Sequence, residues 1–343
     1  RSQESKNSAK DNTQSSAVAE PKNTTIKFTG IASAYNEDGV ATTDSNFVMA
    51  NYANATVTHL KKFNDHALFE SATSNLSINY QGGYNGNDAK MENSTRKEGH
   101  LQNVTAEYST TLALKTDVYD TIESANITIG NFTNPFLDML NEGHGDSLNK
   151  DDRQNSEAGE IRRRVMKTGT TDIRTSNIGI DTTIKGVKIM YSNNLQNDDN
   201  KSLESYGFNW TNNLDNLSTD KFIKVKNIGI MRAKDQKKYE GYTVNTTVAE
   251  KVDFGFTIAK NKTDKNNDGQ IFNLGYKFMD KYKFNMYFGE ADPEEFDQLG
   301  FTITELDSDL SIGYYKQSTT ASGIKTDKEG YGISSKNTFE RSF

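Results

Sequence analysis

Apolar and polar residues alternate along most of this chain. In the stretch FNLGYKF the apolar residues are Phe272, Leu274, Tyr276 and Phe278, and the nearby stretch YKFNMYF repeats the pattern. Successive side chains of a β-strand point to opposite faces of the sheet, so this alternation predicts strands with one apolar face and one polar face. Its recurrence along the chain predicts an all-β protein.

The alternation recurs in sixteen segments, an even number. The three prolines, Pro21, Pro135 and Pro293, all fall outside these segments, which fits because a proline removes a hydrogen bond from a central strand. One segment changes phase near Asn227. The segments span residues 25–35, 46–60, 66–80, 101–121, 126–133, 171–183, 187–193, 203–212, 221–232, 240–249, 252–260, 270–278, 282–290, 297–304, 308–316 and 329–343.

The connections between these segments alternate between short and long. Short ones include IKG, AEK, MDK and ELD, whereas residues 134–170 form the longest. An even number of strands joined alternately by tight turns and longer loops is typical of outer-membrane barrels. We therefore predict a transmembrane antiparallel β-barrel of about 16 strands over residues 25–343, after a polar low-complexity tail over residues 1–24. Further long loops are expected at residues 36–45, 81–100, 193–202, 261–269 and 317–328.

The composition agrees with a barrel that has a wet interior. Hydrophobic residues make up 33% of the chain, below the ~45–50% of globular domains. The 16 tyrosines and 18 phenylalanines argue against a disordered chain. In a water-filled barrel only the outward face needs to be apolar, which explains both observations. A soluble β-sandwich or solenoid would also alternate, but the even strand count and the two loop lengths favour the membrane.

Several classes of protein are excluded by what the sequence lacks. With no cysteine, it has neither a disulfide framework nor thiolate metal sites. A net charge of −7 argues against a nucleic-acid partner. No run approaches the ~18 apolar residues of a membrane helix. No signal-peptide pattern opens the sequence, so an exported protein would be represented by its mature form.

Neither an enzyme nor a strong metal site is predicted. The four histidines occur in no HExxH or Ser/His/Asp pattern, and no serine is marked as a nucleophile. In DKNNDG, the residues Asp264, Asn266 and Asp268 match the first half of a calcium loop, but Gly275 stands where a bidentate glutamate is required. A polar turn is the favoured interpretation. The alternative is a weakly bound calcium or magnesium ion in an external loop, and no other cofactor is expected.

Three stretches resemble a known family. They are IKFTGIASAY, ANITIGNFTNPFLDML, and the C-terminal strand that closes on Phe343. Together they are similar to the trimeric general porins of Gram-negative outer membranes. The resemblance implies a homotrimer in contact with membrane lipids and lipopolysaccharide, a third external loop folded into the barrel, and a terminal Phe343 read by the barrel assembly machinery. The chain departs from the family pattern at Asn131, where an arginine is common, and in its polar tail.

The resemblance makes residues 134–170 the expected constriction loop, because the third loop narrows the pore in this family. Basic residues facing it are expected at lumen positions, out of phase with the apolar faces of the strands. The expected acidic residues are Asp138, Glu142, Asp146, Asp151 and Asp152, followed by Glu157 and Glu160. The expected basic wall comprises Lys27, Lys188, Lys277, Lys283 and Lys336, with Lys224 and Lys226 if their strand keeps its early phase, and Arg162, Arg163, Arg164 and Arg174 at the loop's exit.

Two points about these charges stay open at the level of sequence. Arg174 shares its phase with Ile178 and Ile180, which are expected to face lipid, so either the strand begins above the membrane or a bulge shifts the phase. Any single charge can instead be a solvated loop residue. The tail over residues 1–24 either enters the lumen or lies in the periplasm.

The function that these features predict is passive diffusion of small hydrophilic solutes and ions through an outer-membrane porin, with a mild preference for cations. One alternative is a surface barrel that acts mainly as an adhesin or receptor. The other is a substrate-specific channel, which aromatic residues arranged along the lumen would indicate.

Overall fold

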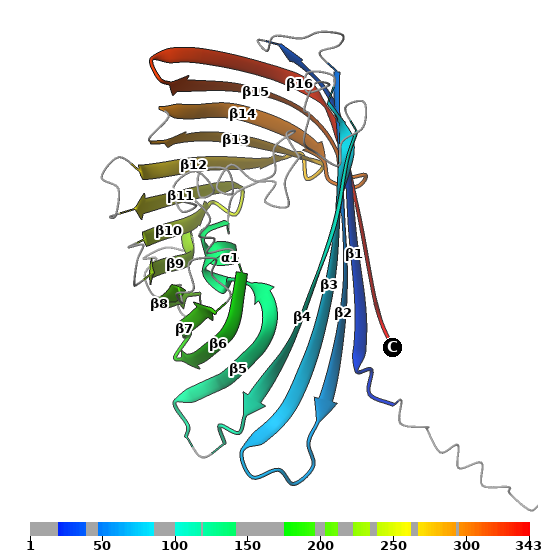
Figure 1. Cartoon of the computed structure of the whole chain (residues 1–343), viewed down its shortest axis with the longest axis vertical. Coiled ribbons are helices and arrows are strands. Elements are labelled where there is room, and N and C mark those ends of the chain that lie inside the picture. The colour runs from blue at the N-terminus through cyan, green and yellow to red at the C-terminus, as the bar shows by residue number, and fades with distance from the viewer. Residues whose placement is uncertain are drawn as a thin grey trace, which may run out of the picture.

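The computed structural model describes residues 20–38, 47–85, 100–117, 119–141, 175–195, 203–211, 222–233, 239–261, 267–292 and 295–343. Over these residues, sixteen antiparallel strands form one closed barrel in which each strand pairs with its neighbours in sequence and β1 pairs with β16 (Figure 1). The strands are β1 (Thr24–Asp38), β2 (Phe47–Lys62), β3 (Phe69–Asn85), β4 (His100–Leu114), β5 (Ile122–Thr133), β6 (Thr175–Ile184), β7 (Val187–Asn194), β8 (Leu203–Trp210), β9 (Ile223–Ala233), β10 (Tyr239–Val248), β11 (Val252–Asn261), β12 (Asn267–Phe278), β13 (Tyr282–Ala291), β14 (Phe296–Glu305), β15 (Leu310–Ala321) and β16 (Ile324–Ser342). The predicted barrel and its strand number are confirmed.

The alternation in sequence becomes an apolar outside and a polar inside. On β13, Phe288 points outward and is 41% exposed, whereas its neighbour Tyr287 points inward and is 1% exposed. The inward face carries amides and hydroxyls, among them the buried side chains of Asn227, Asn245 and Thr243. Closure gives every strand two paired neighbours, so the sheet has no terminal strand, although β4 pairs with β5 only from Ser109 to Ala113.

One predicted loop is wrong, because residues 317–328 belong to strands. β15 continues to Ala321 and β16 begins at Ile324, so only Ser322 and Gly323 form the turn. Both have positive φ angles, 53° and 77°, as a tight two-residue hairpin requires. The segment is polar on both faces and therefore lacks the alternation by which the other strands are found.

Other strand ends differ by a few residues from those predicted. β3 extends to Asn85 and β12 begins at Asn267, so both reach into segments expected to be loops. β4 ends at Leu114, which is earlier than the predicted end at residue 121. Strand ends at the rim of a barrel are polar, as loops are, so polarity alone does not distinguish the two.

The barrel has one tall wall and one short wall (Figure 1). The tall wall consists of β1–β4 and β16, and β3 and β16 have 17 and 19 residues. The short wall consists of β6–β14, and β7 and β8 have 8 residues each. Since a tilted strand needs about 9–11 residues to cross a bilayer, the tall wall is longer than crossing requires.

A single short helix among the described residues, α1 (Pro135–Asn141), lies inside the ring of strands (Figure 1). Asn134 caps it: its Oδ1 accepts a hydrogen bond of 3.1 Å from the backbone N–H of Phe136. Pro135 takes the first helical position, where no backbone donor is needed. The helix packs against β8, β9 and β10. Within the described part of the chain, no helix is long and apolar enough to span a membrane.

Candidate functional site

A polar cavity of ≈ 470 Å³ lies between α1 and the strands from β2 to β7. Pro135 and Asp138 border it from the helix side, and hydroxyl and amide side chains such as Thr56, Ser77 and Asn126 border it from the strands. These groups all exchange hydrogen bonds with water readily, so the cavity can hold hydrated solutes. It is a described part of the lumen that α1 borders on one side.

The charges that line this cavity are mainly negative. Glu107, Asp138 and Asp181 contribute three carboxylates, and Lys188 contributes the one ammonium group among the described lining residues. Asn126 Nδ2 donates to Asp181 Oδ1 at 3.0 Å, and Thr133 Oγ1 donates to Glu107 Oε2 at 3.3 Å. These two uncharged donors help to hold the carboxylates in place.

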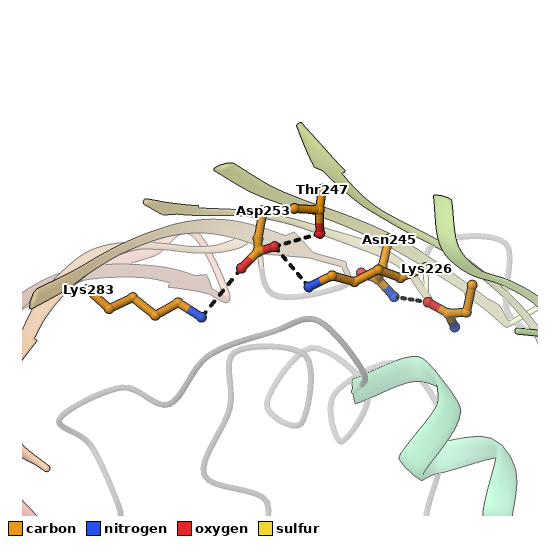
Figure 2. A network of polar contacts seen from close by, with 6 residues as sticks. Lys226, Asn245, Thr247, Asp253 and Lys283 are labelled. Carbon is orange, nitrogen blue, oxygen red and sulfur yellow. Dashed lines mark hydrogen bonds and ion pairs between the residues drawn. The ribbon is translucent and has the colours of Figure 1, made fainter. Parts of the chain in front are cut away.

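A network of opposite character lies on the short wall (Figure 2). Asp253 on β11 accepts from Lys226 Nζ on β9 at 2.8 Å and lies 3.5 Å from Lys283 Nζ on β13. Thr247 Oγ1 on β10 donates to the same carboxylate at 2.8 Å. Two ammonium groups therefore share one carboxylate, which leaves this patch with a formal charge of +1.

A β-bulge places Lys226 in the network. The register pairs Asn227 with Asn245 but Val225 with Thr246, so Lys226 is the extra residue on β9. The phase change predicted near Asn227 is this bulge. Asn227 faces inward as well and accepts a hydrogen bond of 2.6 Å from Asn245 Nδ2, which fixes the strand beside the bulge.

The predicted basic residues that the structure describes lie along the lumen. Lys188 lines the cavity, and Lys283 joins the network around Asp253. The register places Lys27 beside Thr56, which also lines the cavity. Lys277 pairs with Lys283, and Lys336 pairs with the inward-facing Ile31.

Of the predicted acidic residues, Asp138 is described and borders the cavity from α1. The remaining loop charges lie outside the described residues: Glu142, Asp146, Asp151, Asp152, Glu157, Glu160, Arg162, Arg163, Arg164 and Arg174. The tail up to residue 19 also lies outside them.

Sequence reasoning missed three carboxylates on the strands: Glu107, Asp181 and Asp253. It sought acidic residues in the loop and basic residues on the wall. The signal was nevertheless present, since each carboxylate follows or precedes an outward apolar residue, as Asp253 precedes Phe254. The same phase rule that selected the lysines would have selected these carboxylates.

The segment predicted to be a polar turn, with a weak calcium or magnesium site as the alternative, is only partly described. Asp268 lies within β12, where it pairs with Lys260, instead of in a loop. Asp264 and Asn266 fall outside the described residues. Within those residues, no group of three or more acidic or histidine side chains could hold a metal ion.

Acidic residues do gather at the rim where β13 turns into β14. Burial, followed by repulsion from Asp268, Glu290 and Glu295, raises the pKa of Asp292 above its ordinary value. The side chain of Asp292 is exposed, so water screens most of this repulsion.

Phe343 closes the barrel seam on its outer surface. Its backbone N–H donates to Thr24 O at 2.7 Å, and its ring is 55% exposed. The guanidinium of Arg341 lies 5.0 Å from the centre of that ring. An exposed aromatic residue at this end of a strand fits the interfacial girdle of a membrane barrel.

Similarity to solved structures supports the fold. No family model and no curated protein matches this chain. Among solved structures, a double mutant of Rh. blastica porin is similar over 92% of this chain and 100% of its own, with a TM-score of 0.56 and 10% sequence identity. A structure described as "Asymmetric conductivity of engineered proteins" gives the same coverage and TM-score at 9% identity. At such low identity these similarities establish the porin fold of this chain and leave its activity to be argued from the lumen.

Proposed function

We propose that this protein is an outer-membrane porin, a passive diffusion channel for small hydrophilic solutes and ions with a mild preference for cations. The observation that carries the proposal is the polar, carboxylate-rich cavity that α1 leaves open inside a closed sixteen-stranded barrel. Diffusion through such a channel involves no chemical step, so radius and charge at the narrowing select the solute.

The charges along the lumen support the cation preference. Glu107, Asp138 and Asp181 surround the cavity that a solute must cross. The lysines of the short wall are partly compensated, because Lys226 and Lys283 share Asp253. Since charges are screened over ~8 Å at physiological salt, the carboxylates nearest to the path dominate the field that a passing ion meets.

We further propose that the protein forms a homotrimer through contacts between the tall walls of its barrels. On the outward faces of β1 and β2 the register pairs Gly30 with Ala53, and the small residues Ala32 and Ala55 follow on the same faces, paired with Asn51 and Phe28. Small residues let two backbones approach closely in a membrane. The remaining outward surface is apolar and suits lipid, with lipopolysaccharide as the expected neighbour at the external rim.

A substrate-specific channel is the less favoured alternative. The inward-facing tyrosines Tyr35, Tyr287 and Tyr315 are at most 3% exposed, so they offer little aromatic surface to a passing sugar. A barrel that serves mainly as a receptor or adhesin would bind through its external loops, with conduction incidental.

Conductance in a planar lipid bilayer tests the proposal. Purified protein is expected to insert in steps, in groups of three for a trimer, and to give a reversal potential of cation sign in a potassium chloride gradient. A folded protein that gives no steps would contradict the channel. A reversal potential of anion sign would contradict the cation preference alone.

A further inference from the structure

The helix α1 is attached to the barrel wall by apolar side chains, although the lumen around it is polar. Phe136, Leu137, Met139 and Leu140 are all at most 3% exposed. They belong to one apolar cluster with residues of the short wall such as Met231 and Tyr239. Polar contacts assist at the edges: Thr257 Oγ1 donates to Leu140 O at 3.2 Å. The position of α1 therefore depends on how closely these side chains fit the wall.

Two glycines of the wall lie directly under these side chains. A Cβ atom at Gly229 on β9 would lie 2.6 Å from Met139 Sδ and 2.9 Å from its Cγ. A Cβ atom at Gly241 on β10 would lie 2.9 Å from Leu140 Cδ1. These distances are shorter than real Cβ contacts, so an alanine at either position would displace the side chain above it.

Backbone conformation does not account for these glycines. The described glycines with positive φ are Gly83, Gly130, Gly186 and Gly323, so Gly229 and Gly241 have φ angles that any residue adopts. Within a strand, a glycine without a conformational role marks a place where another part of the structure approaches closely. At Gly229 that part is α1, and at Gly241 it is α1 together with Met231 of β9, whose Cγ would lie 2.9 Å from the added Cβ.

We propose that Gly229 and Gly241 are specificity-determining residues of the channel. Their missing side chains form two sockets in which Met139 and Leu140 seat α1 against the short wall, and the depth of these sockets sets the width of the lumen. This inference rests on the proposed channel function. The sockets act through α1, so the two glycines need not touch the solute.

The geometry gives the direction of the effect. Met139 and Leu140 face the short wall, whereas Pro135 and Asp138 of the same helix border the cavity. Filling a socket therefore pushes α1 away from the wall and toward the cavity. Because protein interiors are close-packed, a displaced side chain finds no spare room behind the wall. The lumen should become narrower.

The first test compares unitary conductance among matched variants. Gly229→Ala and Gly241→Ala are each expected to reduce conductance by roughly a third and to lower the size limit for neutral polyethylene glycols. Gly275→Ala is the control for the size limit of neutral polyethylene glycols, since it adds the same methyl group to the lumen face of β12, where its neighbours are Lys283 and Asp253 instead of α1. Adding Met139→Ala to Gly229→Ala is expected to restore the wild-type value, because the contacts of an added Cβ at Gly229 are all with Met139.

The possible outcomes distinguish the proposed role of the two glycines from the proposed channel function. Wild-type conductance in both folded glycine variants would overturn the sockets, as would failure of the second substitution to restore conductance. If the glycine variants do not fold, the pair Gly229→Cys and Met139→Cys tests the contact directly, because the described chain has no cysteine of its own. A disulfide between the two is expected, and its absence would overturn the contact. A wild-type protein that never conducts removes the channel function, while the crosslink still reports on the sockets.

Discussion

The tall wall and the short wall of the barrel differ in the side chains that they present on the outer surface. At mid-height the outward face of the tall wall includes small or polar residues: the register pairs Gly30 with Asn337 and Ala32 with Ser335. The short wall presents large aromatic residues such as Phe256 and Phe301. Lipid chains fill space around large side chains, whereas a second protein surface packs best on a smooth face. This difference is the basis of the proposal that the tall wall contacts a second barrel whereas the short wall contacts lipid.

The largest expected effect comes from a charge on the lipid side of the short wall. Phe256→Lys should lower the free energy of unfolding by ~2–4 kcal/mol, because a lysine near the bilayer midplane loses its hydration. Equilibrium unfolding by guanidinium of protein refolded in lipid vesicles measures this change. Ser311→Lys is the control, since the register places Ser311 on the lumen face beside Ser334. Equal losses in both variants would mean that the two faces do not differ.

The next effect concerns the assembly of the tall wall. Ala32→Trp and Ala53→Trp are expected to prevent close approach of two barrels and so to convert trimers into monomers in detergent. Val244→Trp on the short wall adds the same bulk where lipid yields to it, so assembly should survive. Light scattering after size-exclusion chromatography distinguishes the forms. Trimers that persist in all three variants would assign the contact to another surface.

A smaller effect, on the reversal potential, is expected when single charges on the two sides of the lumen are removed. Asp138→Asn removes a carboxylate from the cavity, so the reversal potential should shift toward anions. Lys226→Gln removes an ammonium group from the network around Asp253, so the shift should be toward cations. Both shifts of the reversal potential can be measured in bilayer recordings at low salt. They should become smaller in 1 M salt, where screening is stronger. Shifts of the same sign would refute an opposed arrangement of charges.

The smallest effect is at the rim of the short wall, where the pKa of Asp292 is raised. Because the folded protein binds this proton more tightly than the unfolded chain does, the charged carboxylate destabilises the fold at neutral pH. That cost disappears as the pH falls through the raised value toward the ordinary aspartate value of 3.8. Asp292→Asn should therefore raise the unfolding midpoint slightly at pH 7 and leave it unchanged at pH 3. A gain that is largest at acid pH would show that the sign is wrong.

The fold followed from the sequence wherever one face of a strand meets lipid and the other meets water. Phe272 and Leu274 alternate with Asn273 for that physical reason, and the strand was predicted within three residues of its start. The rule fails where both faces are wet. Lys325 and Asp327 lie in β16, which is longer than crossing a bilayer requires, and their segment was expected to be a loop.

The candidate site was less accessible from the sequence, because it depends on register between distant strands. The inward phase of Lys188 and Lys283 could be read locally. The meeting of Lys226 with Asp253 could not, since it requires the bulge on β9 and the pairing of β9, β10 and β11. The contact between Gly229 and Met139 joins a strand to a helix that arrives from another part of the chain. Composition and periodicity carry no signal for such a contact.

The seam between β1 and β16 has a consequence for how the protein forms. It pairs Thr25 with Ser342, so the first strand finds its second partner only after nearly the whole chain has been made. Until then the growing sheet has two open edges, each able to recruit a strand from another molecule. Contacts between residues so far apart in sequence form slowly. We therefore expect newly made chains to require a chaperone that shields both edges during this delay. Refolding without a chaperone should give more aggregate as the protein concentration rises.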